Sequence, residues 1–197
     1  MKNKQAELVK QLKDAELYKS LVLTQALLLF IAAILEVLIF DDLNEFLLLF
    51  DYRDWSILLI GIPAGLLVVL YDLVSMRYLP ERYFDDGGIN ERIFSSMNGK
   101  QIFLFVMLVS VAEEILFRGI IQSYAGLGLA SLIFAIIHIR YLYNVYMFFN
   151  ILLLSFFIGI VFEWTGNLFV TITMHFTIDF ILGIVINKQA GKAKAVL

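Results

Sequence analysis

Cysteine is absent from this 197-residue chain, and proline and histidine each occur only twice. Without cysteine the protein has neither a disulfide framework nor thiolate chemistry. Charged residues are also scarce, because they make up 17% of the chain, whereas soluble domains carry about 25%. These absences argue against a soluble globular domain.

Hydrophobic residues make up 61% of the chain, and the mean hydropathy is +0.86. No strand-like alternation is visible, and a helix satisfies its own backbone hydrogen bonds in lipid. The sequence therefore predicts an all-α, polytopic membrane protein with about six transmembrane helices. The apolar blocks that predict them are each near the ~20 residues needed to cross a bilayer: Leu21–Phe40, Ser56–Leu79, Gln101–Gly119, Gln122–His138, Asn144–Glu163 and Asn167–Ile186.

Polar stretches divide the chain into segments. Lysines alternate with leucines before the first block, as in an interfacial helix, and turn-forming residues gather before the third block. The segments expected are an amphipathic cytoplasmic lead-in (1–19), two peripheral transmembrane helices (20–79), a polar loop (80–100), a four-helix membrane unit in the C-terminal half (101–186) and a cytoplasmic tail (187–197).

Lysine and arginine are distributed unevenly over the two ends of these blocks. With the N-terminus inside, all fifteen except Arg53 and Arg118 lie on the cytoplasmic side. The positive-inside rule therefore predicts that both termini are cytoplasmic.

Two adjacent carboxylates stand in the third block, in Val-Ala-Glu113-Glu114-Ile-Leu-Phe-Arg118. A charge at this depth is costly, so it is a functional candidate by default. Glu114 and Arg118 share a helix face and can pair, whereas Glu113 lies about 100° around the helix without a local partner. We expect Glu114 to be structural and Glu113 to exchange protons. The alternative is a helix end whose carboxylates are both hydrated at the interface.

Both histidines also lie in apolar blocks. His138 follows Phe134 by four residues and His175 precedes Asp179 by four, so each pair shares a helix face. A single helix histidine is usually a satisfied core residue, but two of them beside several carboxylates form a chemical set. Glu113, His138, His175 and Asp179 could orient a water molecule or bind a divalent metal.

Other polar residues in the blocks are weaker candidates. Glu36 and Asp72 lie a few residues from block ends, where snorkelling or helix pairing explains them. Asn167 opens the last block and could either cap backbone amides or reach the site.

Three known kinds of intramembrane protease lack their motifs here. The chain has no His-Glu-x-x-His of a metalloprotease and no Gly-x-Ser-x loop that pairs with a histidine. Tyr71-Asp72 matches one half of an aspartyl protease, but Asp179 is not in the Gly-x-Gly-Asp setting of the other half.

The polar residues instead resemble, in chain order, the three signature motifs of the CPBP family. This family comprises CAAX prenyl endopeptidases and bacteriocin-processing or bacteriocin-immunity (Abi) proteins. The resemblance covers roughly residues 100–186, and the run from Gly159 to Leu168 is similar to the lead-in to the family's final motif. The motifs are Glu113-Glu114-x-x-x-Arg118, Phe134-x-x-x-His138 and His175-x-x-x-Asp179.

The resemblance implies a glutamate-type intramembrane endopeptidase whose catalytic unit is residues 101–186. Glu113 and His138 would activate a water molecule for attack on the scissile carbonyl, and Glu114 and Arg118 would be the structural pair. Phe134 and Asn167 would support the site.

The same resemblance implies that His175 and Asp179 stabilise the oxyanion or hold the water. The family more often carries Asn at the last position. Because an ionised carboxylate cannot donate a hydrogen bond, Asp179 could orient His175 instead. No cofactor is expected; the alternative is a divalent metal such as zinc, bound by Glu113, His138, His175 and Asp179.

The block boundaries conflict with this site, because straight helices would hold Glu113 and His138 at different depths. Gly119, Gly126 and Gly128 lie between them. We therefore expect Gly119–Gly128 to form a re-entrant or interfacial segment that shifts the boundaries.

The expected partners are the lipid bilayer and a membrane-associated peptide or protein substrate, with no nucleic acid. A bacterial plasma membrane is the expected location, and the sequence defines no oligomeric state. Two other functions stay open. One is a non-proteolytic bacteriocin-immunity or scaffold protein that binds a peptide or a partner kinase. The other is a small transporter with Glu113 and Glu114 as a proton relay, although no inverted repeat supports it.

Overall fold

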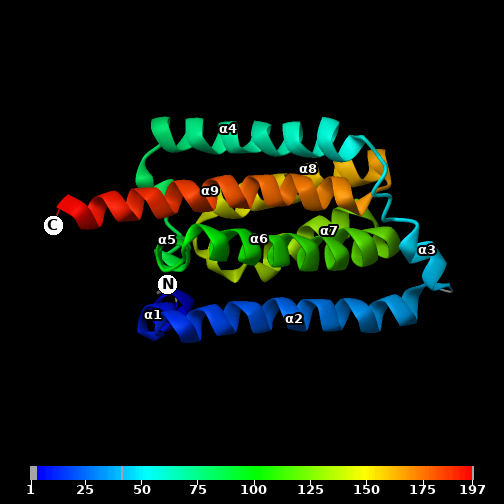
Figure 1. Cartoon of the computed structure of the whole chain (residues 1–197), viewed down its shortest axis with the longest axis horizontal. Helices are drawn as coiled ribbons and strands as arrows, with labels where there is room; N and C mark the ends of the chain where they lie inside the picture. Colours follow the sequence, from blue (N-terminus) through cyan, green and yellow to red (C-terminus); the bar gives the residue numbers. More distant parts are fainter. Residues whose placement is uncertain (1–3, 41, 197) are drawn as a thin grey trace.

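The computed structural model describes residues 4–40 and 42–196, and it describes the side chains of 7–40 and 42–191. Lys2 and the side chains of Lys4, Lys192 and Lys194, all counted for the topology, lie outside the described residues. Regular structure in the described part is helical throughout (Figure 1), which confirms the all-α prediction. In chain order the elements are α1 (Lys4–Gln11), α2 (Asp14–Ile39), α3 (Leu43–Leu47), η1 (Ile57–Gly61), α4 (Ile62–Tyr78), η2 (Glu81–Tyr83), α5 (Ile89–Ser95), α6 (Gly99–Glu114), η3 (Ile115–Gln122), α7 (Ser123–Ile137), η4 (Ile139–Tyr143), α8 (Val145–Thr165) and α9 (Leu168–Val196).

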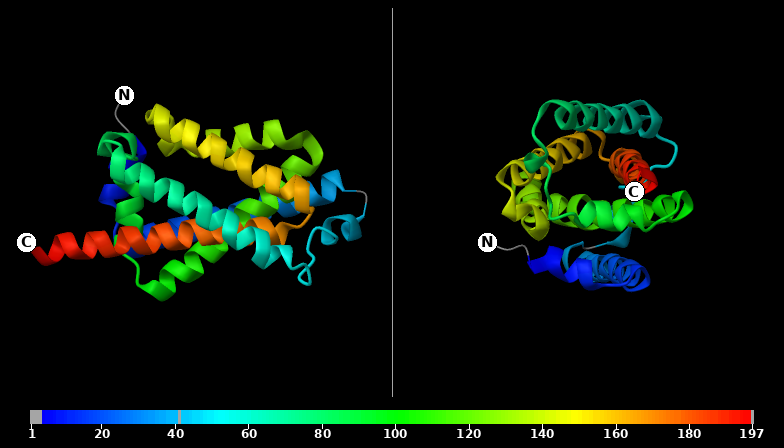
Figure 2. Two further views of the ribbon diagram at one scale, coloured as in Figure 1. Left: turned by 90° about the horizontal axis from the view of Figure 1, so that it is seen from above. Right: turned by 90° about the vertical axis from the view of Figure 1, so that its left-hand side faces the viewer.

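Five helical stretches among the described residues are long and apolar enough to cross a membrane. One of them, Gly99–Ile137, is a hairpin of α6 with η3 and the returning α7 (Figure 2). The chain reverses at Gly126, whose φ of 82° is a conformation that glycine adopts without steric cost. All six predicted apolar blocks are therefore helical, the third and fourth within one of the five stretches, and the protein is a multi-pass membrane protein.

The chain reverses within the expected segment Gly119–Gly128, but the reversal comes late in it. The π-helical stretch η3 continues α6 through Gly119 to Gln122, and the turn comes at Gly126. The apolar block ended at Gly119 because polar Gln122 and Ser123 follow it, but Gln122 is buried and its amide donates to the Gly159 carbonyl at 2.8 Å. An internal partner lets the helix extend beyond the apolar pattern.

The terminal and loop segments are more helical than expected. The membrane helix α2 begins at Asp14, inside the predicted lead-in, and α9 continues through the predicted tail. Helix α5 lies within the predicted polar loop, where the Asp86 carboxylate accepts from the backbone N–H groups of Ile89 and Asn90 at 3.0 and 2.9 Å. That cap satisfies two donors at the helix start.

Helices α2 and α4 flank the C-terminal helices from opposite sides (Figures 1 and 2). Two glycines let α4 approach α9 closely: a Cβ at Gly61 would lie 2.7 Å from the Val170 carbonyl, and one at Gly65 would lie 2.8 Å from that of Met174. Small residues four apart are a common device for packing helices in lipid. The outer faces of α2 and α4 expose large apolar side chains such as Leu27, Phe30, Leu67 and Leu70, which fits contact with a bilayer.

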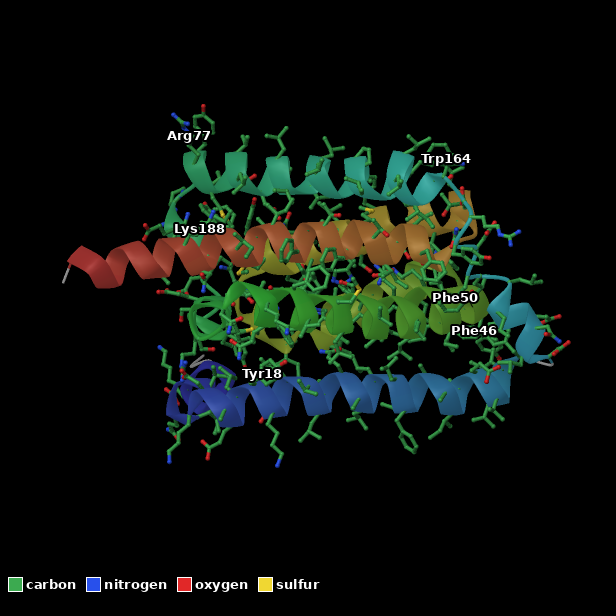
Figure 3. The ribbon with its side chains drawn as sticks, in the orientation of Figure 1. Tyr18, Phe46, Phe50, Arg77, Trp164 and Lys188 are labelled. Carbon is green, nitrogen blue, oxygen red and sulfur yellow. The ribbon has the colours of Figure 1, made fainter. Side chains whose placement is uncertain are left out.

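The two ends of the bundle differ in chemistry. Arg77 and Lys188 lie at the end that carries both termini, and Trp164, Phe46 and Phe50 lie at the other (Figure 3). At that aromatic end the side-chain oxygen Oδ1 of Asn167 accepts from the Phe169 N–H at 3.0 Å. Its amide donates to the Asp51 carbonyl and to the Asp54 carboxylate at 2.8 and 3.2 Å. Asn167 therefore starts α9 and ties it to the preceding loop.

Candidate active site

A cavity of about 1070 Å³ extends into the bundle from the end that carries both termini. Residues 81–91 and η4 line its outer part, and side chains of α2, α6, α8 and α9 line its inner part. Three of the predicted catalytic side chains, Glu113, His138 and Asp179, lie on its wall.

An ion-paired cluster of buried polar groups lies behind this wall. Glu114 and Arg118 are almost fully buried, and the Arg118 Nε atom is 3.4 Å from a Glu114 carboxylate oxygen. The other Glu114 oxygen is 2.8 Å from Nδ1 of His175 on α9. Arg118 also donates to the carbonyl and hydroxyl of Ser155 on α8, at 3.2 and 3.1 Å. The predicted pair thus links three helices, because each partner has further contacts.

Phe134 joins this cluster to the cavity wall. The Arg118 guanidinium lies 4.7 Å from the centre of its ring, and the His138 ring centre lies 4.5 Å away. Phe117 meets the same ring edge-on at 4.9 Å. A cation over a buried ring is favourable, so Phe134 holds both the arginine and the histidine in place.

Glu113 faces the cavity instead of the cluster. Its residue is 8% exposed, and its carboxylate is 3.9 Å from Nε2 of His175. Among the described residues no hydrogen bond to this carboxylate is found, whereas its neighbour Glu114 contacts both Arg118 and His175. The two faces predicted for the glutamate pair are therefore observed, and Glu113 has free acceptor capacity.

His138 follows the last residue of α7, and its ring is fixed from one side. Nδ1 lies 2.7 Å from the Phe134 carbonyl. Because a carbonyl only accepts, Nδ1 must carry the proton, which leaves Nε2 of a neutral ring as an acceptor. Tyr141 stacks on the ring at 5.8 Å between centres. The hairpin at Gly126 returns α7 along η3, and His138 lines the same cavity as Glu113.

His175 stands at the centre of three carboxylates. Nδ1 contacts Glu114, while Nε2 is 3.5 Å from Asp179 and 3.9 Å from Glu113. Asp179 is one helical turn further along α9, as its spacing predicts. A proton on Nε2 would point between the two cavity carboxylates. This arrangement favours an orienting role for Asp179.

Asn167 is not part of this group, since its contacts lie at the opposite end of the bundle. Of the two roles left open for it, helix capping is the one observed.

Three residues on the cavity wall escaped the sequence reasoning. Asp72, set aside as a helix-pairing residue, accepts from the Asn150 amide at 3.4 Å and lines the cavity. Arg140, counted only as a cytoplasmic cation, lies there as well, and the charges of Asp86 and Asp179 act on it. Gln25 is a buried amide in the apolar helix α2. Its position among leucines was the available signal.

The alternative of a metal centre requires several of these side chains to converge on one point. In the described residues no group of three or more His, Asp or Glu side chains is arranged to hold a metal ion. Nδ1 of each histidine is already bound, one to a carbonyl and the other to Glu114.

Comparisons with known proteins show the family of the chain. The family described as "Type II CAAX prenyl endopeptidase Rce1-like" matches residues 97–181, which contain all three motifs. The chain is 43% identical over 157 residues to YpbD of Bacillus subtilis (strain 168), described as an uncharacterized protein, with 80% of this chain and 83% of that protein covered. No solved structure matches the chain. The chain belongs to the CPBP family, in its CAAX prenyl endopeptidase-like branch.

Proposed function

We propose that this protein is an intramembrane endopeptidase that cleaves a membrane-associated peptide or protein with a water molecule activated by Glu113 and His138. The observation that carries the proposal is the contrast on α6, where Glu113 faces a deep cavity without a hydrogen bond while Glu114, behind it, is ion-paired with Arg118 and contacts His175 at 2.8 Å. A carboxylate that must take up and return a proton needs this freedom.

The proposed reaction uses the cavity wall as follows. Glu113 accepts a proton from water while Nε2 of His138 holds the water by accepting its second hydrogen. The oxygen attacks the scissile carbonyl, the C–N bond then breaks, and Glu113 returns the proton to the leaving amine. His175, oriented by Asp179 and Glu114, would stabilise the oxyanion through an Nε2 proton.

The proposed location is a bacterial plasma membrane with both termini and the cavity mouth in the cytoplasm. Arg77 and Lys188 at the terminus-bearing end support this orientation (Figure 3).

We propose that the reaction needs no metal. The described residues offer no set of three metal-binding side chains arranged to hold one ion. Metal analysis of the purified protein, with activity measured before and after chelation, tests this point. Activity that falls with the metal content and returns on zinc addition would overturn it.

The endopeptidase proposal is tested by comparing membrane proteomes of cells that express the wild type or Glu113→Ala. We expect uncleaved proteins to accumulate in the variant and the purified wild type to cleave them in liposomes. A variant that folds and still cleaves them contradicts the proposal. The non-proteolytic alternative, an immunity or scaffold protein, predicts that the cellular effect survives Glu113→Gln.

A further inference from the structure

Charges of opposite sign are separated at the terminus-bearing end of the bundle. Exposed cations, among them Lys10, Lys19, Arg77 and Lys100, lie outside the cavity. The residues that line the cavity include only two guanidinium groups, those of Arg82 and Arg140. Against them stand the carboxylates of Asp72, Glu81, Asp85, Asp86, Glu91, Glu113 and Asp179.

The outer cations are explained by lipid headgroups, but the acidic lining is not. Asp86 caps α5 and acts on Arg140, and Asp179 faces His175, so these carboxylates have roles within the fold. Glu81 and Glu91 are exposed at the mouth and show no ion pair among the described residues. A concave surface with a surplus of one charge concentrates ligands of the opposite charge.

Deeper in the cavity, two polar side chains have an acceptor that receives no hydrogen bond from the described residues. Gln25 is 6% exposed, and its Oε1 atom has no hydrogen-bond donor in the described part of the chain. Glu113 is 8% exposed and equally without a donor. Apolar side chains such as Phe105, Val109 and Leu182 surround them. Unpaired buried acceptors are costly, and the first N–H groups of an inserted peptide helix, which have no partner within that helix, can donate to them.

We infer that the cavity takes a membrane-inserted peptide segment with lysine or arginine at its flank, so that apolar residues lie beside Gln25 and Glu113 and the basic flank lies between Glu81 and Glu91. This inference rests on the proposed function for the identity of the reacting bond, and it adds the class of substrate. An acidic flank would meet repulsion at the mouth.

The experiment measures binding apart from cleavage. The full-length Glu113→Gln protein in phosphatidylcholine liposomes, which carry no net charge, is titrated with fluorescent Leu/Ala helical peptides of about 20 apolar residues. The peptides differ only in the flank, which is a run of lysines, serines or glutamates. We expect the lysine peptide to bind about tenfold more tightly than the glutamate peptide, because a few exposed charge contacts sum to that ratio. Added salt should reduce the ratio.

The double variant Glu81→Lys/Glu91→Lys, made in the same background, should abolish or reverse the preference. Glu7→Lys is the matched control, since Glu7 is exposed at the same end but does not line the cavity. Equal binding of the three peptides overturns the inference, and so does a lysine preference that the double variant leaves unchanged. Selective binding by a wild type that cleaves none of the bound peptides would count against the proposed protease and leave the inference standing.

Discussion

Glu113 and Glu114 are neighbours in sequence, yet they belong to regions of opposite character. Glu114 lies in a dry cluster where Arg118 and His175 engage its two oxygens at 3.4 and 2.8 Å. Glu113 lies on the wall of a cavity with its nearest charged partner at 3.9 Å. A single helix thus carries an ion-paired face in the cluster and a reactive face on the cavity. Substitutions at neighbouring positions should therefore have different effects. Those in the cluster behind the wall should lower stability, and those facing the cavity should lower the rate of cleavage.

The strongest test of the reactive face is Glu113→Gln. The amide keeps the shape but cannot accept the water proton, so cleavage should fall by about 10³-fold or more. The melting temperature in detergent should not decrease, because no hydrogen bond of the fold is lost. Single-turnover cleavage in liposomes measures the first effect and thermal unfolding the second. Glu163→Gln, an exposed site at the other end of the bundle, serves as the control.

The strongest test of the ion-paired face is Arg118→Leu. Removing the guanidinium leaves Glu114 buried without its main counter-charge, and the free energy of unfolding should fall by about 3–5 kcal/mol. Denaturation in detergent measures the loss, with the exposed Arg77→Leu as control. The double variant Glu114→Leu/Arg118→Leu should recover part of the stability, since no charge is then stranded. A double variant that is less stable than Arg118→Leu would contradict this picture of the cluster.

Asp179→Asn sharpens the boundary between the two regions. Its carboxylate is 3.5 Å from Nε2 of His175 and so connects the cluster to the cavity. If Asp179 orients His175, the substitution should lower kcat by about tenfold at constant KM, with little change in thermal stability. An increase in kcat would instead indicate that the residue at this position donates to the oxyanion, as an asparagine amide can.

The ion-paired face could be predicted largely from sequence. The i,i+4 spacing of Glu114 and Arg118 and the histidine with an acid one turn later are local patterns, and helix periodicity alone puts them on common faces. The apolar blocks predicted the presence of the helices, because the bilayer length and backbone satisfaction leave few alternatives, but α2 begins before its block and α9 continues beyond its block.

The cavity could not be predicted in the same way, because its wall is assembled from distant elements. Whether Asp72 or Gln25 faces lipid or cavity depends on how α2 and α4 dock, which no local pattern encodes. The sequence also did not single out Gly126, among the glycines of its segment, as the residue at which the chain reverses. Three glycines in the segment fit a turn equally well, and the buried partner of Gln122 extends the helix beyond the apolar run.

The smallest effect is expected at Gln25, which connects the reactive face to the helix outside the motif region. Gln25→Leu should raise KM about three- to tenfold, the value of one hydrogen bond to a peptide, while kcat stays near the wild-type value. Thr24→Leu is the matched control, because Thr24 is exposed on the adjacent face and its hydroxyl donates to the Ser20 carbonyl at 2.9 Å. Equal KM values for the two variants would mean that Gln25 does not touch the substrate. A fall in kcat for Gln25→Leu would instead indicate that Gln25 positions the reacting groups. A raised KM with an unchanged kcat would show that the surface that binds the substrate extends from α6 across the cavity to α2.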